Sequence, residues 1–212
     1  MHKYLVLNNI QKSQNTFCLR VGRPNMPIKS GQCFNVGIPG MDINREYSMY
    51  SSANAPYLEF LIRAVGDGMV SSNLQKLNVG DEVEVDGPYG EFCIPLDKLD
   101  AKFFFIGSGT GIAPFHSFVQ TYPGLHFTVI HGIRYANEAY DFEDYRGGRY
   151  IPCISRNDGG KSERVTDYLR ANPIPQNSIV YLCGNRNMII DSVQILLDQG
   201  IGGDQIISEV FF

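Results

Sequence analysis

The sequence predicts two domains, an N-terminal antiparallel β-barrel and a C-terminal α/β domain built on a doubly wound parallel sheet. Three observations indicate this fold class. Short runs of β-forming residues, separated by turn clusters, fill the first hundred positions. From about residue 99 onward, apolar strands alternate with helical patterns, as in a parallel sheet. The chain of 212 residues is also long enough for two domains that each bury a core.

The first half reads as six short strands and one helix. Turn residues such as Arg23-Pro24-Asn25 and Pro39-Gly40 separate the strands, and their spacing favours a closed or nearly closed barrel. The helix is expected at 70–77 and a tight turn at 86–90. The expected strands are 4–7, 16–21, 33–38, 46–51, 57–64 and 82–85.

The second half alternates strands and helices. Its last helix carries an apolar stripe that includes Ile189, Val193 and Leu196, and Gly200 follows as a stop signal. The change of pattern places the domain boundary near 97–101. The expected strands are 102–106, 126–131, 149–154 and 178–183, and the expected helices are 113–121, 137–144, 163–171 and 186–199.

Composition and charge exclude several classes of protein. The net charge of -4 argues against nucleic acid as a partner. No apolar run is long enough to span a membrane, and the first residues lack the pattern of a signal peptide. The five cysteines are scattered and include no Cys-x-x-Cys pair. We therefore expect reduced thiols in the cytoplasm, no membrane contact, and no iron–sulfur cluster or metal site belonging to the chain itself.

A glycine-rich stretch, 106–115, lies at the centre of the chain. It follows an apolar strand and contains Gly107, Gly109 and Gly111 before an expected helix. Such a turn presents backbone N–H groups to an anion, and glycine lets a phosphate come close. The common dinucleotide fingerprint would need a third glycine at position 112, where isoleucine stands. An ordinary strand-to-helix turn is the alternative.

Two further motifs lie in the first half. At 45–48, Arg-Glu-Tyr-Ser offers an arginine for a phosphate, a tyrosine for a flat ring and a serine for a ring nitrogen. At 66–72, a glycine turn leads into the short helix with Ser71 in its first turn, which suits an anion. The alternatives are a strand with an exposed charge pair and an ordinary helix cap.

Five motifs occur in one order and together carry a resemblance. They are Arg-x-Tyr-Ser at 45–48, Gly-x-x-Ser at 68–71, Gly-Pro-x-Gly at 87–90, Gly-x-Gly-Thr-Gly-Ile-Ala-Pro at 107–114, and Cys-Gly-Asn at 183–185 with Met188. In this register the chain resembles the ferredoxin–NADP reductase superfamily of flavin- and pyridine-nucleotide-binding oxidoreductases, in particular the bacterial ferredoxin/flavodoxin–NADP reductase type. The resemblance implies an FAD-binding barrel domain at 1–98 and an NADP-binding α/β domain at 99–212.

The resemblance also implies residues that hold FAD. Arg45 would bind the flavin pyrophosphate, Tyr47 would pack against the isoalloxazine, and Ser48 would hydrogen-bond near N5. Further FAD contacts are implied for Ile62, Arg63, Ala64, Gly68, Val70, Ser71, Phe211 and Phe212.

In the second domain the resemblance implies a site for the pyridine nucleotide. Gly109, Thr110 and Gly111 would bind its pyrophosphate, and Cys183 would lie beside the nicotinamide C4. The same motif adds Gly184 and Met188.

The chain ends in Glu209-Val210-Phe211-Phe212. By resemblance, Phe211 would stack on the flavin until the nicotinamide displaces it, and Phe212 would extend toward the adenine side. Glu209 would join Ser48 and Cys183 as the catalytic set that aligns hydride donor and acceptor. A packed strand end is the alternative interpretation of the two aromatic residues.

The choice between NADPH and NADH can be argued from the residues after successive strands. An acidic residue after the second strand selects the free ribose 2′-OH, whereas arginine accommodates a 2′-phosphate. After the second expected strand, Arg134 comes before any acidic residue, and Glu138 is the first. Ser155, Arg156 and Arg164 follow the next strand. These residues predict a phosphate clamp and favour NADPH.

The activity implied is that of an FAD-dependent reductase. It would transfer a hydride between NADPH and flavin N5, and electrons to or from a ferredoxin or flavodoxin. One alternative is an NADH-dependent reductase of free flavin or of an oxygenase. Another is a flavin-binding electron-transfer subunit with little nucleotide turnover. FMN is an alternative to FAD.

Overall fold

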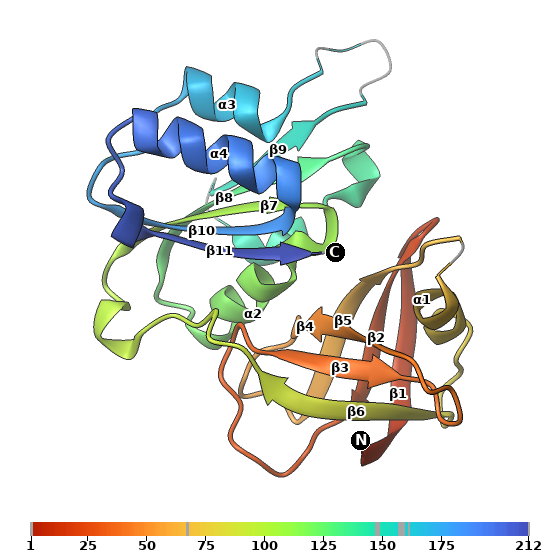
Figure 1. Cartoon of the computed structure of the whole chain (residues 1–212). Coiled ribbons are helices and arrows are strands. Elements are labelled where there is room, and N and C mark those ends of the chain that lie inside the picture. The colour runs from red at the N-terminus through yellow and green to blue at the C-terminus, as the bar shows by residue number, and fades with distance from the viewer. Residues whose placement is uncertain (1, 67, 147–148, 157–159, 161, 212) are drawn as a thin grey trace. The chain divides into compact units, whose positions relative to one another are not determined.

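The computed structural model describes residues 2–66, 68–146, 149–156, 160 and 162–211. The backbone divides into two compact units. The first comprises Met1–Cys93 with Ala113–Thr121, and the second comprises Ile94–Ile112 with Tyr122–Phe212. The chain therefore leaves the first unit, returns to it for a single helix, and then completes the second (Figure 1).

Up to Cys93, the described residues of the first unit form six strands and one short helix. The strands are β1 (His2–Ser13), β2 (Thr16–Gly22), β3 (Cys33–Gly37), β4 (Asn44–Ser48), β5 (Tyr57–Arg63) and β6 (Glu82–Tyr89), and the helix is α1 (Met69–Leu74). They form an antiparallel sheet in the order β4-β3-β6-β1-β2-β5. Phe17, Leu19 and Val21 of β2 are fully buried, because alternate residues of a strand face the same core.

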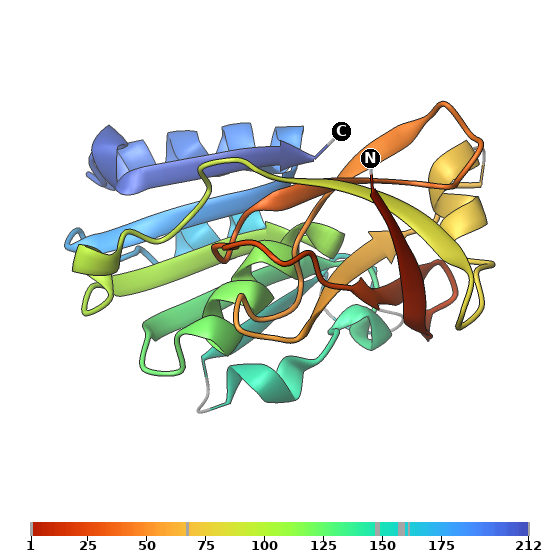
Figure 2. The same ribbon diagram turned by 90° about the horizontal axis from the view of Figure 1, so that it is seen from below.

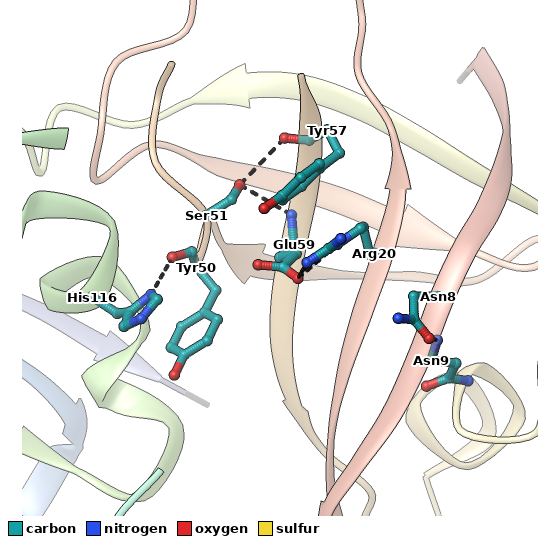
Figure 3. A network of polar contacts seen from close by, with 8 residues as sticks. All are labelled: Asn8, Asn9, Arg20, Tyr50, Ser51, Tyr57, Glu59 and His116. Carbon is teal, nitrogen blue, oxygen red and sulfur yellow. Dashed lines mark hydrogen bonds and ion pairs between the residues drawn. The ribbon is translucent and has the colours of Figure 1, made fainter. Parts of the chain in front are cut away.

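The segment after β4 continues the hydrogen bonding toward β5 at the other edge of the sheet (Figure 3). The Tyr50 N–H donates to the Glu59 carbonyl at 2.7 Å. The Glu59 N–H donates in turn to Ser51 Oγ at 3.1 Å, so the serine hydroxyl takes the place of a backbone acceptor. These bonds curl the sheet toward the nearly closed barrel that the sequence predicts.

The second unit contains a parallel sheet in the order β11-β10-β7-β8-β9. The strands are β7 (Lys102–Ser108), β8 (His126–Ile133), β9 (Tyr150–Ile154), β10 (Ser178–Asn185) and β11 (Ile206–Phe211), and the helices are α3 (Val165–Ala171) and α4 (Arg186–Asp198). In Figure 2 the strands lie side by side, and Figure 1 shows α3 and α4 together over one face of the sheet. The strand order reverses between β7 and β10, and ligands of such sheets bind beyond the carboxyl ends of the strands at that point.

Helix α2 (Ala113–Thr121) clusters with the barrel unit, although the chain enters it directly from the loop after β7. His116 Nδ1–H donates to the Tyr50 carbonyl at 2.7 Å, and the two rings stack with centroids 3.9 Å apart (Figure 3). Thr121 Oγ1 accepts from the Ala53 N–H at 2.9 Å. A buried histidine and a threonine hydroxyl therefore hold the two ends of α2 to the segment after β4.

The structure corrects several expected elements. The helix expected at 137–144 is replaced by two short 3-10 segments, Ala136–Glu138 and Phe142–Tyr145. Asp141 between them has φ 47°, a left-handed conformation that no α-helix accommodates. The tight turn expected at 86–90 is wrong, because the backbone up to Tyr89 belongs to β6. The other 3-10 segments are Leu96–Lys98, Gly109–Ile112 and Gly203–Gln205.

Candidate functional site

The loop after β7 lies against the end of β10. Gly109–Ile112 forms a 3-10 turn at the carboxyl end of the central strand. A Cβ built on Gly111 would lie 2.4 Å from the Cys183 carbonyl oxygen and 2.7 Å from Gly184 Cα. Side chains do not approach backbone this closely, so only glycine permits the contact. The loop can therefore present its N–H groups at the point where the strand order reverses.

Gly184 completes the same contact from the β10 side. It has φ +126°, and a Cβ there would lie 2.5 Å from Ser108 Oγ. Ser108 Oγ accepts from the Asn185 N–H at 2.9 Å. The Asn185 side chain then caps α4 by accepting from the N–H groups of Asn187 and Met188 at 3.0 and 3.3 Å. This chain of contacts fixes the backbone on which the glycine loop rests.

Cys183 and Glu209 are brought together at the end of the sheet. They are register partners on the parallel strands β10 and β11. Cys183 is fully buried, and this burial, with the charge of Glu209, raises the pKa of its thiol well above the ordinary value. The side chain is therefore a neutral thiol at neutral pH and packs as a small apolar group.

The ends of β8 and β9 bring Arg134 and Arg156 into adjacent positions. The Arg156 N–H donates to the Arg134 carbonyl at 2.9 Å, and both side chains are exposed. Arg156 Nη1 donates to the Tyr135 hydroxyl at 3.5 Å. The Ser155 hydroxyl donates to the Ile133 carbonyl at 3.1 Å, whereas the two exposed guanidinium groups can donate to an anion. Arg164 lies on another element, as the exposed N-cap of α3.

An acidic side chain also reaches the end of β8. Glu138 Oε2 accepts from the backbone N–H of Arg134 at 2.8 Å. The sequence places Glu138 four residues beyond Arg134, and the short 3-10 segment folds it back onto the strand end. A carboxylate there is a feature of sites that bind a free ribose 2′-OH. Sequence spacing alone did not reveal this contact.

On the barrel, β4 positions Arg45, Tyr47 and Ser48. Arg45 is exposed, and its Nη1 donates to the Asn44 carbonyl at 2.8 Å. Tyr47 is half-buried against the barrel core, and this burial raises the pKa of its phenol to about 12 despite the opposing charge of Arg45. Ser48 is buried at the end of the strand. The phenol is therefore a neutral flat ring beside a cationic group.

The loop after β5 is held on helix α1. Ile62 is buried and Arg63 half-exposed at the end of β5, and the Ala64 N–H donates to the Asn15 carbonyl at 2.7 Å. Ser71 Oγ accepts from the Val65 N–H at 3.2 Å. The Gly68 N–H also donates to the Val65 carbonyl at 2.8 Å. These three hydrogen bonds hold the loop to the barrel and to the start of α1.

Val70 and Ser71 are buried in the first turn of that helix. The Ser71 oxygen accepts the hydrogen bond from the Val65 N–H, and the Ser71 hydroxyl proton can be donated to an anion.

At the other end of the chain, Phe211 is half-buried on β11 as the register partner of Asn185. Phe212 lies outside the described residues.

The described part of the chain contains neither a cluster of metal-ligating side chains nor a membrane-spanning helix. Among these residues no group of three or more histidine, cysteine, aspartate or glutamate side chains could hold a metal ion. In the same residues, no helix is both long and apolar enough to cross a membrane.

Comparisons with known proteins agree with this architecture. Residues 5–94 match the family model of the oxidoreductase FAD-binding domain, and residues 105–194 match that of the oxidoreductase NAD-binding domain. The chain belongs to the ferredoxin–NADP reductase superfamily. The expected fold class is confirmed, as are FAD and a pyridine nucleotide as the cofactors of the superfamily's two domains.

Three members of the superfamily illustrate the range of relatives. A ferredoxin–NADP reductase from Azotobacter vinelandii is 28% identical over 206 aligned positions, covering 82% of this chain and 80% of that protein. The electron transfer component of toluate 1,2-dioxygenase from Pseudomonas putida is 27% identical over 214 positions, covering 92% of this chain and 63% of that protein. A crystal structure of a ferredoxin NADP+ reductase from Neisseria gonorrhoeae with bound FAD and NADP has a TM-score of 0.87 and 25% identity, covering 100% and 98% of the two chains.

Within the second unit, some of the expected residues lie together. Gly111, Cys183 and Gly184 are in contact around the glycine loop, and Arg134 lies next to Arg156. Sequence reasoning missed His131, whose ring bonds to the carbonyl of Gly109 at 2.7 Å. A histidine within the apolar part of the strand, Val129 to Ile133, was the available signal.

Proposed function

We propose that the protein is an FAD-dependent NADPH reductase. The observation that carries this proposal is the pair of adjacent exposed arginines, Arg134 and Arg156, at the ends of β8 and β9. Two guanidinium groups at this edge suit the extra 2′-phosphate of NADPH, because arginine binds phosphate through paired hydrogen bonds. Ser155 and Arg164 would complete the clamp.

The residues present fit a dinucleotide at the loop after β7. A Cβ at Gly111 or Gly184 would collide with backbone or with Ser108, so the strand end is built for a close backbone approach. We assign the pyrophosphate of the nucleotide to the N–H groups of Gly109, Thr110 and Gly111. Gly184 and Met188 would line the nicotinamide side.

On the barrel, Arg45 would bind the FAD pyrophosphate together with Gly68, Val70 and Ser71. Tyr47 and Phe211 would cover the flavin ring, and Phe212 would extend beyond it. The backbone of Ile62, Arg63 and Ala64 would line the ring. When bound, FAD accepts a hydride at N5 and can pass electrons on singly or in pairs. Ser48, Cys183 and Glu209 would orient donor and acceptor and exclude water.

We propose a ferredoxin or flavodoxin as the physiological electron partner, a domain boundary at 98/99, and the cytoplasm as the compartment. Relatives named as ferredoxin–NADP reductases support the partner. The test of the activity is direct: the purified protein is expected to show a flavin spectrum and to reduce ferricyanide faster with NADPH than with NADH. Bound flavin with no oxidation of either nucleotide would favour the electron-transfer-subunit alternative.

Arg156→Ala is expected to raise KM for NADPH about 10- to 100-fold and to leave KM for NADH unchanged. The loss reflects one or two charge-assisted hydrogen bonds to the 2′-phosphate, worth about 1.5–3 kcal/mol. Steady-state kinetics with ferricyanide measure both constants. Arg170→Ala, an exposed arginine on α3, is the matched control. Equal losses for the two nucleotides would remove Arg156 from the clamp.

Phe211→Ser is expected to lower KM for both nucleotides severalfold and to weaken the preference for NADPH. A ring that covers the flavin must be displaced before the nicotinamide can bind, so its removal lowers the free energy of that step. The same assay measures it, with Phe142→Ser as control because Phe142 is an exposed aromatic of another segment. Unchanged constants for both nucleotides would contradict the covering role.

A second candidate, an NADH-dependent reductase, is favoured by one observation. The Glu138 carboxylate lies at the end of β8, where an acidic group can bind the free ribose 2′-OH. Glu138→Gln distinguishes the two. In an NADPH enzyme, this change removes a negative charge that repels the 2′-phosphate, so KM for NADPH stays the same or falls. In an NADH enzyme, it raises KM for NADH about tenfold.

A further inference from the structure

His131 is a buried polar side chain that the proposed catalytic set does not use. It lies on β8 beside Gly107 of β7, and none of its surface is exposed. Its Nε2 is 2.7 Å from the Gly109 carbonyl oxygen, and its Nδ1 is 2.7 Å from the Tyr150 hydroxyl. Both ring nitrogens are therefore bonded, one to the glycine loop and one to β9.

The partners determine where the imidazole carries its proton. A carbonyl oxygen can only accept, so Nε2 carries the hydrogen that is donated to Gly109. Burial disfavours the charged ring and lowers the pKa of His131 to about 4. In the neutral ring Nδ1 has a lone pair, which accepts the proton of the Tyr150 hydroxyl. The Tyr150 ring stacks on Tyr145 with centroids 5.4 Å apart, which holds the hydroxyl in place.

The bond to Gly109 has a consequence for the next residue. In a trans peptide the C=O and the following N–H point in opposite directions, so a carbonyl held by His131 directs the Thr110 N–H the other way. Gly109 has φ +55°, and a Cβ there would meet no atom within 4 Å, so the loop is open on that side. Glycine permits both signs of φ, so the histidine adds a side-chain anchor to the backbone bonding of the 3-10 turn at this peptide.

We propose that neutral His131 is a positioning residue that turns the Gly109 carbonyl away from the nucleotide and aims the Thr110 N–H at its pyrophosphate. The inference rests on the proposed function, since it deepens the role of the same loop. Tyr150 acts one step further out, because its hydroxyl donates to the Nδ1 lone pair and so holds the ring that donates to Gly109. Without this bond, the Gly109 carbonyl oxygen, which carries a partial negative charge, could face the negatively charged pyrophosphate.

The first test needs no nucleotide and no turnover. Imidazole 15N spectra of the flavin-loaded protein are expected to show His131 as the Nε2–H tautomer in the wild type and in Tyr150→Phe, because the Gly109 carbonyl can only accept, and the Nδ1 resonance is expected to shift when the Tyr150 hydroxyl is removed. The Thr110 amide resonance is expected to shift in Tyr150→Phe and in His131→Leu. A His131 that carries its proton on Nδ1 would overturn the inference.

The second test measures binding of NADP+ by titration of the flavin spectrum. His131→Leu is expected to weaken binding about tenfold, and His131→Gln, which restores an N–H donor near Nε2, is expected to recover most of the loss. His126→Leu is the matched control, because His126 is exposed at the start of the same strand. Flavin content and the thermal midpoint identify any variant that does not fold. Equal losses in the leucine and glutamine variants, or no loss in either, would overturn the positioning role.

The proposed function and the role of His131 can be disproved independently of each other. A wild-type protein that binds neither NADP+ nor NAD+ would overturn the proposed function and, with it, the role of His131 toward a nucleotide. A wild-type protein that binds NADP+ but shows the wrong tautomer would overturn the inference alone.

Discussion

Gly111→Ala is expected to abolish measurable binding of pyridine nucleotide and to lower the thermal midpoint by roughly 4–10 °C. The added Cβ would lie 2.4 Å from the carbonyl oxygen and 2.7 Å from the carbonyl carbon of Cys183. These are backbone atoms of β10, which pairs with β7 on one side and β11 on the other, so they cannot move aside without disturbing both ladders. The loop must move instead, and the N–H groups that face the pyrophosphate move with it.

Gly203→Ala is the matched control for this change. It places a methyl group in the same unit, and a Cβ there meets no atom within 4 Å. We expect it to leave the thermal midpoint and NADP+ binding near the wild-type values. Flavin content should be retained in both variants, because the residues assigned to the flavin pyrophosphate belong to the barrel. A Gly111→Ala protein with a wild-type midpoint and affinity would show that the loop can relax and that the close contact is not required.

The glycine loop shows how far sequence reasoning reached. Its spacing correctly indicated a tight backbone turn after a buried strand, and the missing glycine at position 112 argued against the common fingerprint. Ile112 is fully buried in the structure. The close approach is made instead by Gly111 against β10, with Gly184 as its counterpart 73 positions later. A single motif cannot reveal a contact between two distant glycines, but the ordered set of five motifs included both.

Other features were hidden because they depend on tertiary contacts. A helix is expected at 137–144, yet Asp141 in a left-handed conformation divides the segment. Helix α2 was correctly bounded by its pattern, but its clustering with the barrel depends on His116 and Thr121, which bond to residues 66 and 68 positions away. His131 follows the apolar residues Val129 and Ile130 in its strand, and its bond to Gly109 becomes visible only when β7 and β8 are paired.

Between pH 6.5 and pH 4, the wild-type protein is expected to lose about 3 kcal/mol of stability that His131→Gln does not lose. The pKa of His131 is lowered by burial from 6.5 to about 4. In this range the unfolded chain binds a proton at His131 that the folded chain does not, so stability rises with pH up to 6.5 and falls as the pH is lowered. The contribution is fully present above pH 6.5 and is lost progressively toward pH 4.

Urea unfolding of both proteins at several pH values isolates this contribution, because carboxylates that titrate below pH 5 affect wild type and variant alike. The neighbouring phenols of Tyr150 and Tyr145 add no charge in the range, since burial raises the pKa of both above the ordinary value. Glutamine retains a donor for the Gly109 carbonyl and has no ionisable group, so the difference in slope belongs to the imidazole. Parallel slopes for the two proteins would mean that His131 binds a proton in the folded state. The Tyr150 hydroxyl would then have to accept from Nδ1–H instead of donating to Nδ1.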